Sequence, residues 1–144
     1  MPELSQDDLA AVTTLRASVL RLGRRLRNER VDESLSVTEL SVLGWLVRCG
    51  PATPGELARR EHVQPPSMTR IVAMLEVKGL VRRDPHPEDR RQVVVTATDQ
   101  AEAMVLESRR RRDAWLAGRV ESLSEEEWAA LRVAAPVLER LADL

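Results

Sequence analysis

A chain of 144 residues that is 43% hydrophobic and 31% charged has the composition of a water-soluble globular domain, which argues against a disordered or membrane-spanning protein. Its N-terminus has no signal-peptide character and its lone Cys49 cannot form a disulfide within the chain, so we expect a cytoplasmic protein. The formal net charge is −1, so the chain as a whole is close to electrically neutral.

The first predicted helix runs from about Ser5 to about Glu29, because Ser5 and Asp8 resemble a capping box. Its apolar residues follow a near-heptad stripe, which consists of Leu9, Val12, Leu15, Val19, Leu22 and Leu26. Arginines occupy its other faces. A single narrow stripe on so long a helix predicts that the helix packs against a partner helix.

A second helix is predicted to start at another capping box, formed by Ser36 and Glu39, and to end at Gly50-Pro51. Its inward residues are Leu40, Leu43, Leu46 and Val47. We interpret Cys49, near the end of this helix, as a buried structural thiol rather than a redox sensor. The chain has no second cysteine that would resolve a sulfenate formed there.

A helix-turn-helix is predicted to follow. Thr53 and Glu56 form a third capping box, so a short helix starts at Pro54. The next helix starts at Pro65-Pro66, because proline is tolerated in the first helical turn, and Gly79 closes it. Helical spacing gives this second helix an inward face that consists of Met68, Ile71, Val72 and Leu75.

The opposite face of that helix is small, polar and basic. It carries the candidate DNA-binding residues Pro65, Pro66, Ser67, Thr69 and Arg70. Such a face can enter the roughly 12 Å wide major groove, where a proline ring can also pack on a thymine methyl group. An ordinary solvent-facing helix surface is the alternative interpretation.

Two β-prone runs, residues 80–83 and 92–96, are separated by a charged loop, which predicts a hairpin. A helix-turn-helix followed by such a hairpin is a winged helix, whose basic loop reaches the minor groove or the phosphates. The candidate DNA-binding residues of this wing are Asp89, Arg90 and Arg91. The alternative is a solvated loop in which the arginines pair with Glu88 and Asp89, and exposed pairs of that kind contribute little to stability.

Two further helices are predicted after the hairpin. Thr98 can cap a long helix that runs to about Val120 and spans roughly 35 Å, so its distal half must project from a compact core. The final helix starts at a capping box of Ser124 and Glu127, and Pro136 should kink or break it. These helices and the first one carry more apolar surface than one small domain can cover, which predicts homodimerisation.

Residues 65–70 and 89–98 resemble the matching segments of the MarR-type winged-helix repressors, and the resemblance covers nearly the whole chain. The second segment is similar to the family's D-x-R-x-x-x-V-x-L-T signature, with Ala97 in place of the leucine. This difference should alter the packing beneath the wing and leave its charges unchanged. In the family, the arginine matching Arg91 enters the minor groove and the acid matching Asp89 orients it, so the resemblance implies these roles here.

We therefore predict a mostly α fold with a small β-hairpin. The winged helix-turn-helix core takes residues 35–98, an N-terminal dimerisation helix takes residues 1–34, and C-terminal dimerisation helices take residues 99–144, all within one structural domain. The resemblance also implies a pocket for a small-molecule effector between the core and the dimerisation helices. An aromatic wall for it would have to come from Trp45 or Trp115, although a place in the core is the favoured interpretation of both. Arg16 or Arg24 can hold a carboxylate, with pairing between helices as the alternative, so the sequence assigns no ligand residues.

The predicted function is a homodimeric transcriptional regulator, acting as a repressor, that binds a palindromic DNA operator and is released by a small-molecule or redox effector. The alternative is a winged-helix module that binds a protein, which has no need of Arg90 and Arg91. No enzyme is predicted, because no nucleophile, base and orienting group stand at a usable spacing. We expect no cofactor and no membrane partner, and His62, His86 and Cys49 are too few to build a metal site.

Overall fold

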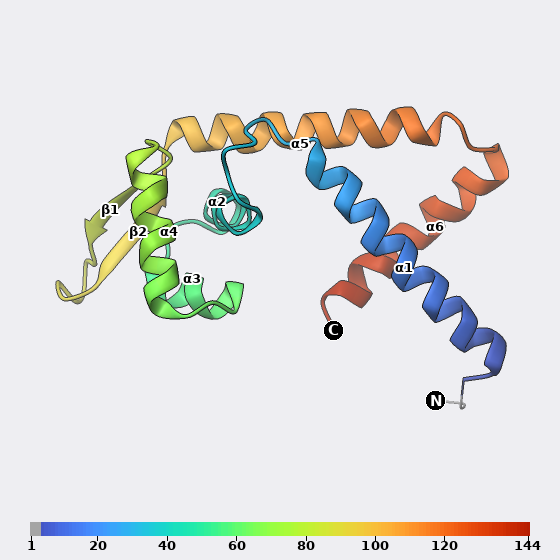
Figure 1. Cartoon of the computed structure of the whole chain (residues 1–144), viewed down its shortest axis with the longest axis horizontal. Coiled ribbons are helices and arrows are strands. Elements are labelled where there is room, and N and C mark those ends of the chain that lie inside the picture. Colours follow the sequence, from blue (N-terminus) through green and yellow to red (C-terminus); the bar gives the residue numbers. More distant parts are fainter. Residues whose placement is uncertain (1–3) are drawn as a thin grey trace. The chain divides into compact units, whose positions relative to one another are not determined.

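The computed structural model describes residues 4–144, which form six helices and a two-stranded hairpin (Figure 1). In chain order these elements are α1 (Gln6–Asn28), α2 (Val37–Cys49), α3 (Pro54–Glu61), α4 (Pro65–Val77), β1 (Val81–Pro85), β2 (Val93–Ala97), α5 (Asp99–Val120) and α6 (Glu125–Ala142). The mostly α fold class and the predicted order of elements are confirmed. The first three residues of the predicted N-terminal segment lie outside the described residues.

The chain divides into two compact units. One comprises residues 30–110, and the other comprises residues 1–29 with residues 111–144. Helix α5 therefore begins in the first of these units and ends in the second. In the part of the chain that the structure describes, no helix is long and apolar enough to cross a membrane.

Four helices start with the capping boxes that the sequence predicts. In each box the side chain of a serine or threonine accepts a hydrogen bond from the backbone three residues later, and the acidic side chain there accepts one from the cap. The pairs are Ser5 with Asp8, Ser36 with Glu39, Thr53 with Glu56, and Ser124 with Glu127. Each helix start is thus determined by residues that are neighbours in the sequence.

The unit of residues 30–110 has a closed apolar core. The inward face predicted for α4 is correct, since Met68, Val72 and Leu75 are buried and Ile71 packs against them. In α2, Val42 is also fully buried, although it is not among the inward residues that the sequence predicts. Helix α2 contacts both α3 and β2. The covered face of α2 is therefore broader than the single apolar stripe of a surface helix.

The hairpin pairs β1 with β2 in antiparallel register, from Val81 opposite Ala97 to Pro85 opposite Val93. Each strand is displaced by one or two residues from its predicted position, so the connecting loop is residues 86–92. Ala52 pairs with Val95 through backbone hydrogen bonds of 3.1 and 2.8 Å, which ties the chain before α3 to the hairpin. Gly79 adopts a φ of 73°, the left-handed conformation expected at the end of α4.

The other unit leaves its apolar residues exposed. Neither α1 nor α6 has a buried residue. The exposed residues of α1 include Leu9, Val12, Leu15, Val19 and Leu22, and those of α6 include Trp128, Leu131, Leu138 and Leu141. Helix α6 continues through Pro136, so of the predicted kink or break the break is wrong. Loss of a single amide donor is tolerated here because the turns on both sides continue the helix.

Candidate nucleic-acid interface

Helices α3 and α4 are joined by a tight turn whose backbone is determined locally. His62 caps α3 in the left-handed conformation, with φ 53° and ψ 40°. The amide of Val63 then donates to the carbonyl oxygen of Ala58 at 3.1 Å. Gln64 is extended, as expected for a residue before proline, and α4 begins at Pro65. This geometry is the predicted helix-turn-helix.

The candidate residues of α4 share one accessible face. Pro65, Pro66, Ser67, Thr69 and Arg70 are all exposed. The hydroxyl of Thr69 donates to the carbonyl oxygen of Pro65 at 3.0 Å, and this local bond orients its methyl group and oxygen on the helix surface. Among the residues that the structure describes, Arg70 makes no ion pair. The face therefore offers one cation among short polar and apolar side chains.

The wing brings Asp89 and Arg91 together. Asp89 Oδ1 accepts hydrogen bonds from the backbone amide of Arg91 at 3.1 Å and from its Nε at 3.3 Å. The Arg91 side chain is nevertheless 92% exposed, whereas that of Asp89 is 37% exposed. Arg90 is exposed as well. A guanidinium held at its Nε by a neighbouring carboxylate keeps its terminal nitrogens available for an outside acceptor.

A second ion pair joins the hairpin to α4, and sequence reasoning missed it. Arg83 on β1 donates to Glu76 on α4 through Nε at 3.0 Å and through Nη2 at 2.8 Å, a bidentate pair. The Arg83 guanidinium lowers the pKa of Glu76 below its ordinary value. This contact positions the wing relative to α4. No sequence signal marks it, because the two residues lie on different elements and their spacing matches no local motif.

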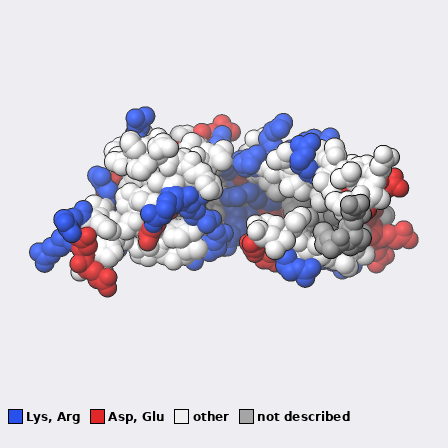
Figure 2. All heavy atoms as spheres, turned by 90° about the horizontal axis from the view of Figure 1, so that it is seen from below, with Lys and Arg blue, Asp and Glu red and all other residues white. Residues whose placement is uncertain are grey.

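Charge on the candidate interface is mixed rather than uniformly basic. The wing, at the left of Figures 1 and 2, carries basic and acidic atoms side by side at its tip. Arg82 pairs with Asp84 at 3.0 Å, so part of the basic charge on β1 is neutralised within the protein. A surface of mixed charge attracts nucleic-acid phosphates less strongly than a uniformly basic one.

Cys49 does not lie where we predicted. It is exposed, so its interpretation as a buried thiol is wrong. The residue follows Leu46 at helical spacing and belongs to the inward stripe of α2 by sequence. However, α2 ends at Cys49, and the chain turns at Gly50, whose φ is 91°.

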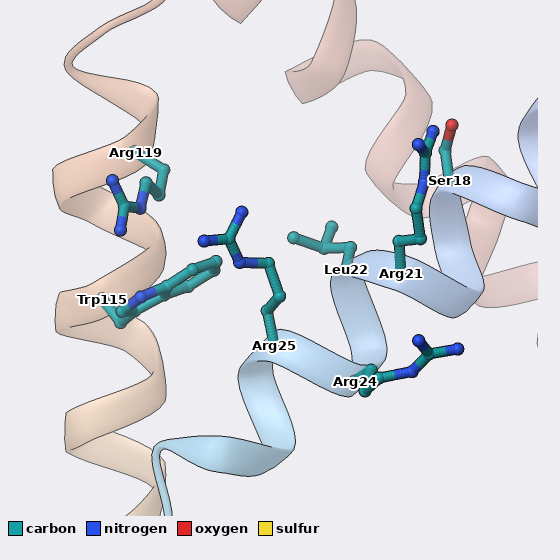
Figure 3. Close-up of a pocket in the computed structure, with 7 residues that line it drawn as sticks. All are labelled: Ser18, Arg21, Leu22, Arg24, Arg25, Trp115 and Arg119. Atoms are coloured by element: carbon teal, nitrogen blue, oxygen red, sulfur yellow. The ribbon is translucent and has the colours of Figure 1, made fainter.

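The unit that contains α1 has a cavity of about 520 Å³ lined by Ser18, Arg21, Leu22, Arg24, Arg25, Trp115 and Arg119 (Figure 3). The guanidinium of Arg119 lies 5.1 Å from the centre of the Trp115 ring, and that of Arg25 lies 5.9 Å from it. Two of the residues considered for an effector pocket, Trp115 and Arg24, thus line one cavity. Trp45 instead packs against the core of the other unit.

Comparisons of the sequence and of the structure with known proteins point to the same family of transcriptional regulators. The model of the MarR family matches residues 35–93. The HTH-type transcriptional regulator Mb0904 of Mycobacterium bovis is 42% identical over 94% of this chain and 95% of its own. The HTH-type transcriptional repressor MdtR of Bacillus subtilis is 27% identical over 81% of this chain and 77% of its own. A solved structure of a putative transcriptional regulator from Pseudomonas aeruginosa superposes with a TM-score of 0.86 at 31% identity, covering 98% of this chain and 99% of the other.

Proposed function

The chain belongs to the MarR family of transcriptional regulators, and from this premise we propose that its homodimer binds a palindromic DNA operator in the cytoplasm and represses transcription. The name of MdtR, a transcriptional repressor, supports the direction of regulation. We assign DNA contact to the winged helix-turn-helix of residues 35–98 and dimerisation to residues 1–34 and 99–144.

The observation that carries the DNA-binding proposal is the exposed face of α4 in the same compact unit as the wing. The small side chains of Ser67 and Thr69 let the helix approach base edges, and Arg70 supplies a donor fork suited to guanine. Arg91 extends from the wing, and Asp89 does not engage its terminal nitrogens. This arrangement suits insertion of the guanidinium into the minor groove of DNA. The bidentate pair of Arg83 with Glu76 supports the wing from α4.

Homodimerisation is supported by the apolar surface of α1 and α6. Leu9, Val12 and Val19 are each about half exposed. Exposed apolar side chains contribute no free energy of burial until a partner covers them, so a contiguous stripe of them marks an interaction surface. A second copy of the chain is the partner with a matching stripe, and a two-fold axis would present two α4 helices to two half-sites about 34 Å apart.

The cavity beside Trp115 supports release by a small molecule. Arg21, Arg24, Arg25 and Arg119 give it a strongly positive lining, and the indole ring gives it an aromatic wall. We assign it an effector with an anionic group and an apolar body. The effector releases DNA if it binds better to the dimer geometry that mismatches the half-site spacing.

Fluorescence anisotropy tests the proposal. The purified chain is titrated against DNA from upstream of its own gene and against a scrambled duplex, at two salt concentrations and with or without benzoate as an anionic aromatic probe. We expect preference for the upstream DNA that survives the higher salt and weakens with benzoate. Absence of binding to either duplex would contradict the DNA-binding role, and undiminished binding at saturating benzoate would contradict this effector class.

A further inference from the structure

The loop of the wing is held together by the ring of His86, which follows β1 directly. His86 Nδ1 accepts hydrogen bonds from the backbone amides of Glu88 at 3.1 Å and of Asp89 at 3.2 Å. The His86 amide donates to the carbonyl oxygen of Gln92 at 3.0 Å, and the Gln92 amide donates to that of Asp89 at 2.9 Å. The imidazole thus occupies the centre of the loop and shapes its turn.

Both bonds to the ring require the neutral form of His86. An imidazole nitrogen accepts hydrogen bonds only while it carries no proton, so the proton of the neutral ring must be on Nε2. Protonation of Nδ1 would turn the acceptor into a donor facing two other donors. The two amides of Glu88 and Asp89 would then lose their partner at once.

The ring acts on the proposed DNA-contacting arginine through one intermediate residue. The amide of Asp89 is held by His86, and the carboxylate of the same residue holds the amide and Nε of Arg91. His86 therefore determines where the Asp89 carboxylate lies, and Asp89 determines the direction in which Arg91 leaves the wing.

We propose that His86 is a positioning residue for DNA recognition, whose neutral ring sets the wing so that Arg91 enters the minor groove, and that acid releases this setting. The inference rests on the proposed function, because it assumes that the wing contacts DNA. It gives the regulator a response to pH that depends on a single side chain.

Charged groups of both signs lie near the His86 ring. A cavity of about 400 Å³ beside His86 is also lined by Thr53, Glu56 and Arg59 of the α3 region and by Gln92. The acidic residues around the ring are Glu56, Glu88 and Asp89, and the basic one is Arg59. The carboxylate of Glu56 accepts a hydrogen bond from the Thr53 amide at 2.8 Å, so it already has a partner.

Protonation has two opposite effects on DNA binding. The added positive charge strengthens attraction to any duplex. Loss of the two hydrogen bonds to the ring weakens only those DNA contacts that depend on the position of Arg91. The ratio of affinity for operator to affinity for a scrambled duplex cancels the first effect, since both duplexes carry the same phosphate charge. This ratio is therefore the quantity to measure.

The experiment compares His86→Asn with His86→Ala in the full chain. Asparagine places Oδ1 where histidine has Nδ1 and does not titrate, so it preserves the acceptor at every pH, whereas alanine removes it. All variants carry His62→Asn, which eliminates the only other histidine and suits the left-handed conformation of that residue. Anisotropy is measured with operator and scrambled duplexes at pH 7.5 and pH 5.5, across the range in which histidine changes charge.

At pH 7.5 we expect the alanine variant to lose about fivefold in the affinity ratio, as for two weakened loop hydrogen bonds, and the asparagine variant to match the parent. At pH 5.5 the ratio of the parent should fall toward that of the alanine variant, while the asparagine variant keeps its ratio. Equal ratios for parent and alanine variant at pH 7.5, or an asparagine variant as weak as the alanine variant at either pH, would overturn the proposal.

A measurement without DNA separates this inference from the proposed function. In amide NMR spectra, the signals of Glu88 and Asp89 should shift with the same midpoint as the His86 ring and stay constant in His86→Asn. Amides that ignore the titration of the ring would overturn the inference even if operator binding is specific. A parent chain that shows no preference for operator would overturn the proposed function together with the role of His86 in it.

Discussion

The Arg91 side chain is 92% exposed, and its contact with Asp89 uses only Nε of its guanidinium. We predict that Arg91→Ala weakens operator binding by about 1–3 kcal/mol, measured by anisotropy at fixed salt. Arg82→Ala is a matched control, because Arg82 is also exposed and also pairs through Nε with an aspartate two residues away. Equal losses in the two variants would reduce the role of Arg91 to general charge.

Arg70 tests whether the exposed face of α4 reads bases. We predict that Arg70→Ala lowers operator affinity and relaxes the preference at one base position in each half-site, because a guanidinium fork discriminates guanine from other bases. Binding to a panel of operators with single base changes measures this. Uniform losses on all sequences, random DNA included, would reassign Arg70 to a phosphate contact.

At the scale of elements, the hairpin depends on α4 through Arg83 and Glu76. Because the Arg83 guanidinium lowers the pKa of Glu76 in the folded chain below the ordinary 4.5, folding is favoured where the carboxylate is charged. This contribution is complete above about pH 4.5 and is lost as pH falls through the lower pKa of the folded state.

We therefore predict that Glu76→Gln flattens the acid side of the stability profile. Between pH 6 and pH 3 the thermal midpoint of the native chain should fall further than that of the variant, as followed by circular dichroism. Arg83→Met should produce the same flattening, and the double variant should add nothing further, because both changes remove one interaction. Parallel pH profiles for native and variant chains would show that the pair contributes nothing measurable, as many exposed pairs do.

At the scale of the whole molecule, the stripe on α1 decides the oligomeric state that we propose. Leu15→Glu places a charge in the centre of the stripe, so we predict a shift from dimer to monomer in sedimentation equilibrium. Operator affinity should fall by at least about tenfold, because two half-sites are no longer bound as a unit. Thr14→Glu, an exposed change of the same charge beside the stripe, should leave the dimer intact.

A monomer that forms equally in both variants would show that charge on α1, rather than the apolar stripe, controls assembly. Retention of the dimer in Leu15→Glu would place the interface on another surface, and α6 carries further exposed apolar residues.

The sequence by itself determined where the helices begin, which face of α4 is buried and where the hairpin lies. Capping boxes, prolines at helix starts and helical spacing act between residues at most a few positions apart, so they are legible without coordinates. The exposed candidates on α4 and the wing were likewise predictable as surface residues, since the opposite positions had to fill the core.

Only the tertiary structure decided which distant groups meet. The exposure of Cys49, the full burial of Val42 and the pair of Arg83 with Glu76 all depend on how elements pack. The acceptor role of His86 depends on the path of a seven-residue loop. These contacts leave no periodic pattern in the sequence. They form between side chains or loop backbone atoms that tertiary packing brings together, whereas sequence patterns report local backbone conformation.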